Sequence, residues 1–239
     1  MFVKIQGMNV IVTGASSGVG YELAKKLITD DRVTKVICIA RRGDRLIELS
    51  KVALSVDRTE RFIGLSEDVN TISFSSITSH ISRVDILVNN AGLLIVKPFH
   101  ELTDDDFLTV YKTNVFAPAR LIRLLIPIMG GSLPSHVVNI GSMGGFQGSS
   151  KFSGLSAYSS SKSALAGLSE CLAEELKEEN IKVNCLAFGA VQTEMLQSAF
   201  PDYSATLLAS EMADFVLNFA FNGHRFFNGK VLPVSSSTP

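Results

Sequence analysis

The sequence has no excess of charge of either sign. Its 239 residues carry 22 Lys and Arg against 23 Asp and Glu, a net charge of −1, and no acidic or basic block stands out. Nucleic acids and anionic membranes attract proteins through clustered positive charge. We therefore expect neither a nucleic acid nor a membrane among the partners of this protein.

Cysteine and histidine are also few, and neither occurs in a metal-binding pattern. The three cysteines form no close-spaced pair and the four histidines lie far apart: Cys38, Cys171, Cys185, His80, His100, His136 and His224. Disulfide frameworks use an even number of cysteines, and zinc sites usually pair their ligands along the chain. We expect no disulfide framework, no metal site and a reducing, cytoplasmic compartment.

Two kinds of apolar segment are missing as well. The N-terminus MFVKIQGMNVIVTG lacks a charged leader followed by an apolar stretch and a cleavage site. No window reaches about 18 uninterrupted apolar residues, the length that spans a bilayer. Because 46% of the residues are nevertheless hydrophobic, they must lie in a core, and the length suits one domain over residues 1–239.

Short, nearly continuous apolar runs alternate with helical patterns along the chain. The runs are Met8–Thr13, Lys35–Ala40, Arg61–Leu65, Asp85–Val88, His136–Ile140, Lys182–Ala187 and Lys230–Val234. Helices are predicted over Val19–Thr29, after a Thr103 cap with Asp106 three residues later, over Tyr158–Glu179 and from near Glu211. Continuous apolar strands are covered on both faces. The pattern predicts a Rossmann-like α/β domain, a doubly wound parallel sheet with helices on both faces.

A glycine-rich loop follows the first strand and leads directly into a helix. It reads Thr-Gly-Ala-Ser-Ser-Gly-Val-Gly over 13–20. A pyrophosphate needs a tight turn, close backbone approach and free N–H groups at a helix start. The candidates are Gly14, Ser16, Ser17, Gly18, Val19 and Gly20. A plain strand-to-helix turn is the alternative.

This loop resembles the cofactor fingerprint of the short-chain dehydrogenase/reductase family, and further segments over about residues 7–195 match that family in order. They contain Asp68, Val69, Asn89, Asn90, Ala91, Gly92, Asn114, Ser142, Tyr158, Lys162, Gly189, Val191 and Thr193. The resemblance implies a nicotinamide cofactor, with Asp68 and Val69 beside its adenine and Thr193 at its carboxamide. It also implies a homodimer or homotetramer.

The end of the second strand indicates which cofactor is preferred. An acid there would bind the ribose hydroxyls of NAD and repel a 2′-phosphate. The strand instead ends Ile39-Ala40-Arg41-Arg42, with no acid before Asp44. A guanidinium can pair with a phosphate in a bidentate fashion. We predict NADP over NAD, although Ser17 adds no charge and both arginines could be solvated turn residues.

Tyr158 and Lys162 are the predicted proton-transfer pair, because four-residue spacing places them on one helix face. A nearby ammonium is expected to lower the pKa of the phenol. Tyr21 and Lys25 repeat the spacing, but no serine-bearing strand end precedes them, so we interpret them as surface helix. Ser142 follows a strand and can donate to a substrate oxygen.

The family resemblance implies that Asn114 helps to hold a water that links Lys162 to solvent. A buried polar residue (Asn114) and a strand-end turn residue (Ser142) are the plainer interpretations. The 143–157 stretch is longer than the family pattern, so it could reshape the pocket, or Ser156 could share the role of Ser142. Phe188 stands where the family usually has proline. A short substrate lid over about 193–210 offers candidate lining residues, which could equally pack on the core: Met195, Leu196, Phe200 and Tyr203.

The leading hypothesis is an NADP-dependent oxidoreductase that interconverts a carbonyl and an alcohol on a small or medium organic substrate. A dehydratase or epimerase on the same scaffold is an alternative, and so is a non-catalytic NADP-binding sensor. The intact set of Ser142, Tyr158 and Lys162 favours redox chemistry, because a pure sensor has no need of it.

Overall fold

The computed structural model describes residues 7–235, and its centre is a seven-stranded sheet in which every pairing is parallel. The strand order is β3-β2-β1-β4-β5-β6-β7. The strands are β1 (Met8–Thr13), β2 (Val33–Ala40), β3 (Phe62–Ser66), β4 (Ile86–Asn89), β5 (Ser135–Ser142), β6 (Ile181–Phe188) and β7 (Val231–Val234). All seven expected strands are present, with ends displaced by a few residues.

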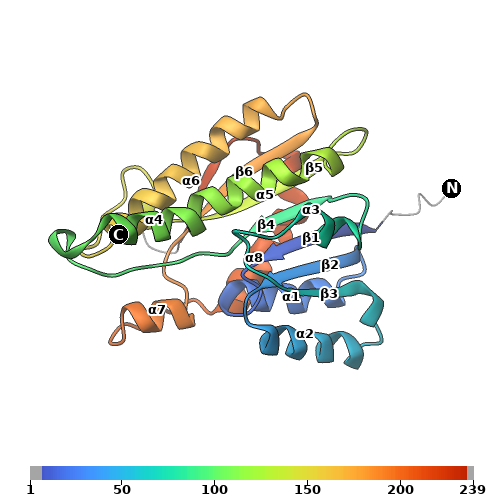
Figure 1. The fold of residues 1–239 in the computed structure, drawn as a ribbon, viewed down its shortest axis with the longest axis horizontal. Coiled ribbons are helices and arrows are strands. Elements are labelled where there is room, and N and C mark those ends of the chain that lie inside the picture. The colour runs from blue at the N-terminus through green and yellow to red at the C-terminus, as the bar shows by residue number, and fades with distance from the viewer. Residues whose placement is uncertain (1–6, 236–239) are drawn as a thin grey trace.

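Helices cover both faces of the sheet (Figure 1). They are α1 (Gly18–Thr29), α2 (Gly43–Ser55), α3 (Phe74–Thr78), α4 (Asp104–Tyr111), α5 (Ala117–Leu125), α6 (Ser156–Glu175), α7 (Glu194–Ala199) and α8 (Ala209–Asn222). Buried side chains of α1, α2 and α8 form one core cluster, and those of α3, α5 and α6 form the other. This is the predicted doubly wound, Rossmann-like fold in one domain.

Local sequence explains the start of α4 and the end of α6. Thr103 and Asp106 form the expected reciprocal capping box at α4, with Asp106 N–H donating to Thr103 Oγ1 at 3.1 Å. The prediction that the third helix runs to Glu179 was wrong, since α6 ends at Glu175. Asn180 takes a left-handed conformation, φ 61°, and the chain turns there into β6.

Three helices that the sequence analysis did not predict complete the fold. α2 buries only Leu46, Leu49 and Ala53 along its length, and α3 and α7 are very short. The buried residues of α2 have the spacing of an amphipathic helix, so the sequence analysis overlooked a signal that was present, whereas α3 and α7 are too short to show a period. No helix within residues 7–235 is both long and apolar enough to cross a bilayer.

The strand order reverses direction between β1 and β4, which lie side by side. Open α/β sheets bind ligands in the crevice outside the carboxyl ends of the strands at such a switch point. The loops after β1, β4, β5 and β6 all leave the sheet at this edge. The candidate residues therefore converge there although they are far apart in sequence.

Candidate active site

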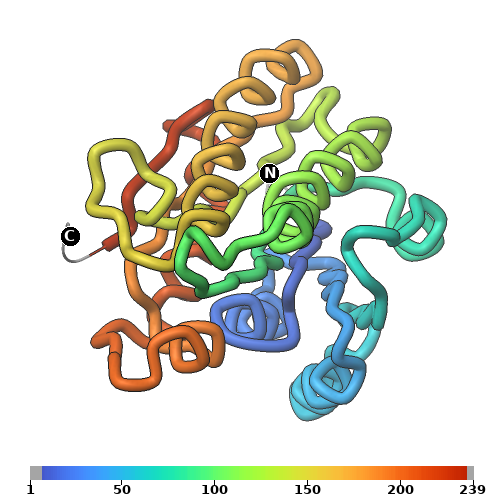
Figure 2. The backbone as a smooth tube through the Cα atoms, turned by 60° about the vertical axis from the view of Figure 1, so that its left-hand side comes forward, coloured from blue at the N-terminus to red at the C-terminus, as the bar shows by residue number. Residues whose placement is uncertain are grey.

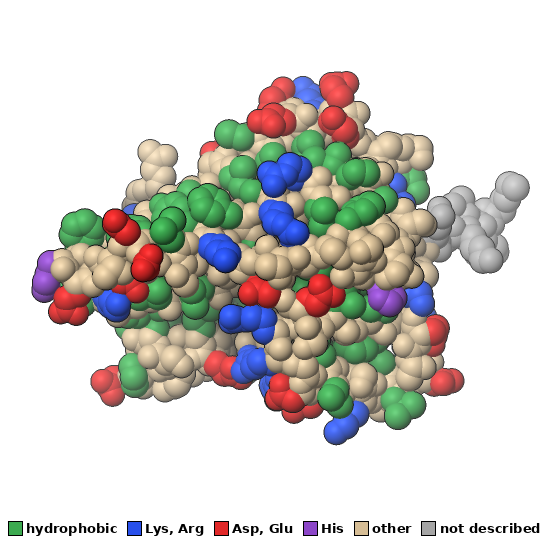
Figure 3. Space-filling view, in the orientation of Figure 1, with side chains coloured by type: hydrophobic (Ala, Val, Ile, Leu, Met, Phe, Trp, Pro, Cys, Tyr) green, Lys and Arg blue, Asp and Glu red, His purple; other side chains and the backbone are tan. Residues whose placement is uncertain are grey.

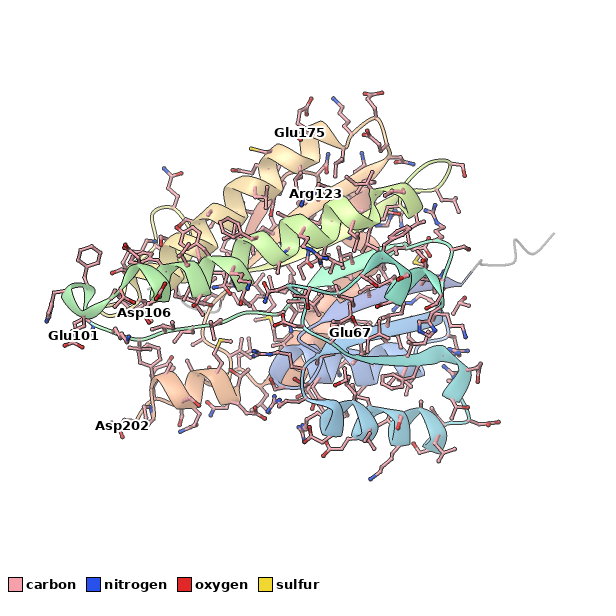
Figure 4. All side chains as sticks on the ribbon, viewed as in Figure 1. Glu67, Glu101, Asp106, Arg123, Glu175 and Asp202 are labelled. Atoms are coloured by element: carbon pink, nitrogen blue, oxygen red, sulfur yellow. The ribbon has the colours of Figure 1, made fainter. Side chains whose placement is uncertain are left out.

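A single cleft of about 1530 Å³ lies across the carboxyl edge of the sheet. Its lining contains nearly every residue that the sequence analysis selected, from the glycine loop to Thr193. Four do not line it: Gly20, Asn89 and Asn114 are buried, and Ser156 is exposed at the start of α6. In Figure 4, Glu67 marks the end of the cleft beside β3.

The glycine loop needs its glycines for two different reasons. Gly14 and Gly18 have φ values of 68° and 53°, in the left-handed region that favours glycine. At Gly20 a Cβ atom would lie 2.5 Å from the Gly14 carbonyl oxygen. The hydrogen of Gly20 thus permits the loop to fold on itself, and its expected place beside a pyrophosphate stays a prediction. Ser17 makes no capping hydrogen bond at the start of α1.

Thr13 ties the loop to the end of β4, a role that the sequence analysis missed. Its Oγ1 accepts hydrogen bonds from the backbone N–H groups of Asn90, at 3.1 Å, and Ala91, at 3.0 Å. The Asn90 amide returns the contact by donating to the carbonyl oxygens of Thr13 and Gly14. The available signal was a hydroxyl at the last position of a strand beside the loop.

The two arginines after β2 differ in their partners. Arg42 donates to the carbonyl oxygen of Ser16 at 3.1 Å and forms an ion pair with Glu194 of α7 at 3.0 Å. Arg41 is exposed, lines the cleft and forms no ion pair within residues 7–235. Arg41 is therefore the guanidinium with free donors at this end of the cleft.

Asp68, after β3, is held in a defined orientation. Its Oδ1 accepts from the backbone N–H of Asn70 at 2.9 Å and from the Asn70 amide at 2.8 Å. The backbone hydrogen bond from Asn70, and to a smaller extent the charge of Arg41, keep the pKa of Asp68 below its ordinary value. Asp68 is thus ionised and fixed beside the buried side chain of Val69.

Ser142 and Tyr158 meet across the cleft from two elements. Ser142 is the last residue of β5, and its Oγ accepts from the backbone N–H of Gly144 at 3.1 Å. Its hydroxyl lies close enough to the Tyr158 phenol, in the first turn of α6, to oppose the rise in the pKa of that phenol. The Gly144 N–H holds the serine oxygen in place, and Ser142 and Tyr158 line the same cleft.

Lys162 lies one turn beyond Tyr158 and is nearly sealed from solvent, with 4% of its surface exposed. Its Nζ donates to the Ile140 carbonyl oxygen at 2.8 Å and lies 5.8 Å from the centre of the Tyr158 ring. Burial lowers the pKa of Lys162 to about 8. The amine is directed at the Gly92 backbone, where a Cβ atom would lie 3.5 Å from it.

The pKa of Tyr158 differs from our expectation. We expected the ammonium to lower it, but burial of the phenol raises it and outweighs the opposing effect of the Ser142 hydrogen bond. In the protein alone Tyr158 is therefore a neutral phenol at physiological pH. A neutral phenol can act as a proton donor.

Asn114 lies in a π-helical turn, Lys112–Phe116, between α4 and α5. Its Oδ1 accepts from the Leu93 N–H at 2.8 Å, while its Nδ2 donates to the Leu93 carbonyl and to Ser161 Oγ, both at 2.9 Å. Both atoms of the side-chain amide are therefore engaged by protein groups. Asn114 fastens the segment after β4 to α6, next to Lys162.

The loop after β6 closes the other side of the cleft. Thr193 Oγ1 accepts from the Leu196 N–H at 3.2 Å and so caps α7. A Cβ atom on Gly189 would lie 2.4 Å from Ser235 Oγ, so only glycine fits beside that residue. Phe188 is the last residue of β6 and pairs with Val234, so this position is strand. Residues 7–235 contain no cluster of three or more His, Cys, Asp and Glu side chains that could hold a metal ion.

Comparison with known proteins agrees with this geometry. The chain is 31% identical over 221 residues to a fatty acyl-CoA reductase of Acinetobacter baylyi, covering 90% of this chain and 73% of that protein. L-Sorbose reductase from Gluconobacter frateurii, solved with NADPH and L-sorbose, is 25% identical, with a TM-score of 0.84 over 100% of this chain and 98% of that chain.

A 4-hydroxyisoleucine dehydrogenase solved with NADH shares the fold, at 23% identity and a TM-score of 0.80 over 97% of this chain and 98% of that chain. Residues 8–204 match the short chain dehydrogenase family. That match covers most of the chain and includes every element of the site up to α7. The chain therefore belongs to the short-chain dehydrogenase/reductase family of oxidoreductases.

Proposed function

We propose that this protein is an NADP-dependent oxidoreductase that interconverts a carbonyl and an alcohol on a small or medium organic substrate. The observation that carries the proposal is the meeting of Ser142, Tyr158 and the buried Lys162 amine in the same cleft as the glycine loop. A protein that only senses the cofactor has no need of two hydroxyl donors, Ser142 and Tyr158, beside the buried Lys162 amine.

The chain supplies binding and proton transfer, and a bound nicotinamide supplies or accepts the hydride. The Ser142 hydroxyl donates to the substrate oxygen and stabilises the charge that develops there. The Tyr158 phenol, neutral at physiological pH, gives its proton to the same oxygen during reduction. Lys162 places positive charge behind the phenolate that remains, which lowers the cost of forming it.

The cleft suits a dinucleotide. The glycine loop and the uncapped start of α1 would hold the pyrophosphate, and Asp68 with Val69 would lie beside the adenine. Gly92, Gly189 and Thr193 border the place where a nicotinamide would reach Tyr158. The backbone N–H groups at the start of α1 are thus available to the negative charge of the pyrophosphate.

We assign the choice of NADP to Arg41, because Arg42 is already paired with Glu194. Arg41→Ala should weaken NADPH binding about 10- to 100-fold and leave NADH binding nearly unchanged. Arg123→Ala is the matched control, since Arg123 lies on α5 outside the cleft lining (Figure 4). Titration of nicotinamide fluorescence measures both constants. NADH binding as tight as NADPH binding in the unaltered protein would contradict the assignment.

The activity itself is tested by mixing the protein with NADPH and a panel of aldehydes and ketones, and following absorbance of the reduced nicotinamide. We expect oxidation of NADPH that depends on both the carbonyl and Tyr158. Oxidation that persists in Tyr158→Phe at the original rate would contradict the proposed chemistry.

We also propose that the chain forms a homodimer or homotetramer in the cytoplasm through the helices that start near Thr103 and Tyr158. Leu108 and Phe116 are exposed on α4 and on the turn after it. Figure 3 shows exposed hydrophobic side chains over this region. Leu108→Glu should lower the mass measured by light scattering, whereas a monomeric unaltered protein would exclude the assembly.

A further inference from the structure

The cleft has a charged end and an uncharged end. Arg41, Arg42, Glu67 and Asp68 line the end beside β2 and β3. Beyond Ser142 and Tyr158 the lining changes to aliphatic and aromatic side chains from three separate segments. We propose that the substrate is a neutral carbonyl compound with an apolar body of several carbons. The inference rests on the proposed function and specifies its substrate class.

One apolar wall is built by the long loop after β5. The backbone N–H of Lys97 donates to the Gly154 carbonyl oxygen at 3.1 Å, which fastens the 143–155 loop to the segment after β4. Gly154 has φ 80°, and a Cβ atom there would lie 3.1 Å from a Val96 methyl group. This close approach brings four apolar lining residues together: Leu94, Val96, Phe152 and Leu155.

The opposite wall comes from α7 and the segment after it. Its lining residues are Met195, Leu196, Ala199, Phe200 and Tyr203. Gln192 fastens this segment, because its N–H donates to the Leu207 carbonyl at 2.8 Å and its Oε1 accepts from the Ala205 N–H at 2.9 Å. In Figure 2 α7 and the 143–155 loop lie at the same end of the molecule. The residues of both walls line the same cleft.

No charge on these walls is available to pair with a charged substrate. Glu194 forms an ion pair with Arg42, and the charge of Lys112 acts on Asp68. The buried Lys162 amine donates to the Ile140 carbonyl oxygen. Glu101 and Asp202, at the outer tips in Figure 4, do not line the cleft. A carboxylate or phosphate placed between the walls would lose its hydration without gaining a partner.

The exposure of the walls supports the same conclusion. Phe152 is 50% exposed, Tyr203 50%, Val96 42% and Met195 40%. Contiguous exposed apolar surface at a cleft marks a place where an apolar ligand removes that surface from water. Within the α7 wall, Ser198 and the Tyr203 hydroxyl are the uncharged polar side-chain groups that line the cleft.

The test compares two ketones that differ only at the far end. Octan-2-one ends in a methyl group, and 7-oxo-octanoate has a carboxylate in its place. We expect kcat/KM to favour octan-2-one by at least about 10-fold. Binding to NADPH-loaded Tyr158→Phe, measured by calorimetry, should show the same preference without turnover, so it reports on the walls even if the proposed reaction is wrong.

A charge introduced on one wall sharpens the test. Met195→Lys should raise the relative use of 7-oxo-octanoate about 10-fold, because it supplies the missing partner. Met195→Gln, of similar size but neutral, and Leu54→Lys, exposed on α2 outside the cleft, should not. Equal or tighter binding of 7-oxo-octanoate by the loaded protein, or no binding of either ketone, would overturn the inference. Loss of turnover with octan-2-one still bound would instead count against the proposed reaction.

Discussion

Tyr158–Lys162 and Tyr21–Lys25 have the same spacing on two helices and almost the same local geometry. The lysine Nζ lies 5.8 Å from the ring centre in the first pair and 5.7 Å in the second. Their surroundings differ. Lys162 is buried against a carbonyl oxygen, while Lys25 forms an ion pair with Glu22 at 2.9 Å and is partly exposed.

The two phenols also have different neighbours. The Tyr21 hydroxyl donates to Glu48 at 3.3 Å, and that carboxylate is one reason, after burial, why the pKa of Tyr21 is raised. Tyr158 has the neutral Ser142 hydroxyl as its neighbour. A phenol bonded to a carboxylate cannot serve a substrate oxygen at the same time. A tyrosine and a lysine four residues apart on a helix therefore do not by themselves indicate a proton-transfer pair. The groups around them decide whether the phenol is available to a substrate.

The largest effect is expected from removing each phenol in turn. Tyr158→Phe should lower kcat about 1000-fold, since positioned acids contribute on this scale, and should leave NADPH binding intact. Tyr21→Phe should change kcat less than about twofold. Steady-state rates with NADPH and a ketone measure both. Comparable losses in the two variants would break the distinction.

Replacing the two lysines should separate function from stability. Lys162→Met should lower kcat about 100-fold, yet raise the free energy of unfolding at pH 7 by roughly 2 kcal/mol, because a buried charge is removed. Lys25→Met should leave kcat unchanged and cost only a few tenths of a kcal/mol, as surface pairs do. Urea unfolding measures the stability. A lower free energy of unfolding in Lys162→Met than in the unaltered protein would show that burial of the Lys162 amine does not destabilise the fold.

A smaller effect is expected from the serine that distinguishes the two pairs. Ser142→Ala should lower kcat about 30-fold through loss of one donor to the developing charge. Ser156→Ala should have little effect, because Ser156 is exposed at the start of α6. A larger loss in Ser156→Ala than in Ser142→Ala would transfer the role to the neighbouring serine.

The smallest expected effect is a pH dependence of stability. Burial lowers the pKa of Lys162 from 10.5 to about 8. Between these values the unfolded chain holds a proton that the folded protein has released, so this group makes the folded state more stable as pH rises from 8 to 10.5. The stability advantage of Lys162→Met over the unaltered protein should therefore shrink across that range. Denaturant titrations at pH 7.5 and pH 10 compare the two, and Lys25→Met should show no such convergence.

Much of the architecture could be predicted because it depends on local pattern. Continuous apolar runs marked all seven strands, and the Thr103–Asp106 box marked the start of α4. The short helices α3 and α7 were not predicted, because few of their residues face the core. Two contacts join residues that are distant in sequence, so no local sequence pattern predicted them. They are the Arg42–Glu194 ion pair and the Lys97–Gly154 hydrogen bond.

The sequence by itself determined the strand and glycine-loop pattern and the order of candidate residues along the chain, because periodicity and strand-end positions act over a few residues. Only the tertiary structure decided that burial raises the pKa of Tyr158, that Gly20 serves packing and that Asn114 fastens two segments. Burial and hydrogen bonding depend on what the rest of the chain places around a residue. Two identical spacings could therefore acquire different surroundings.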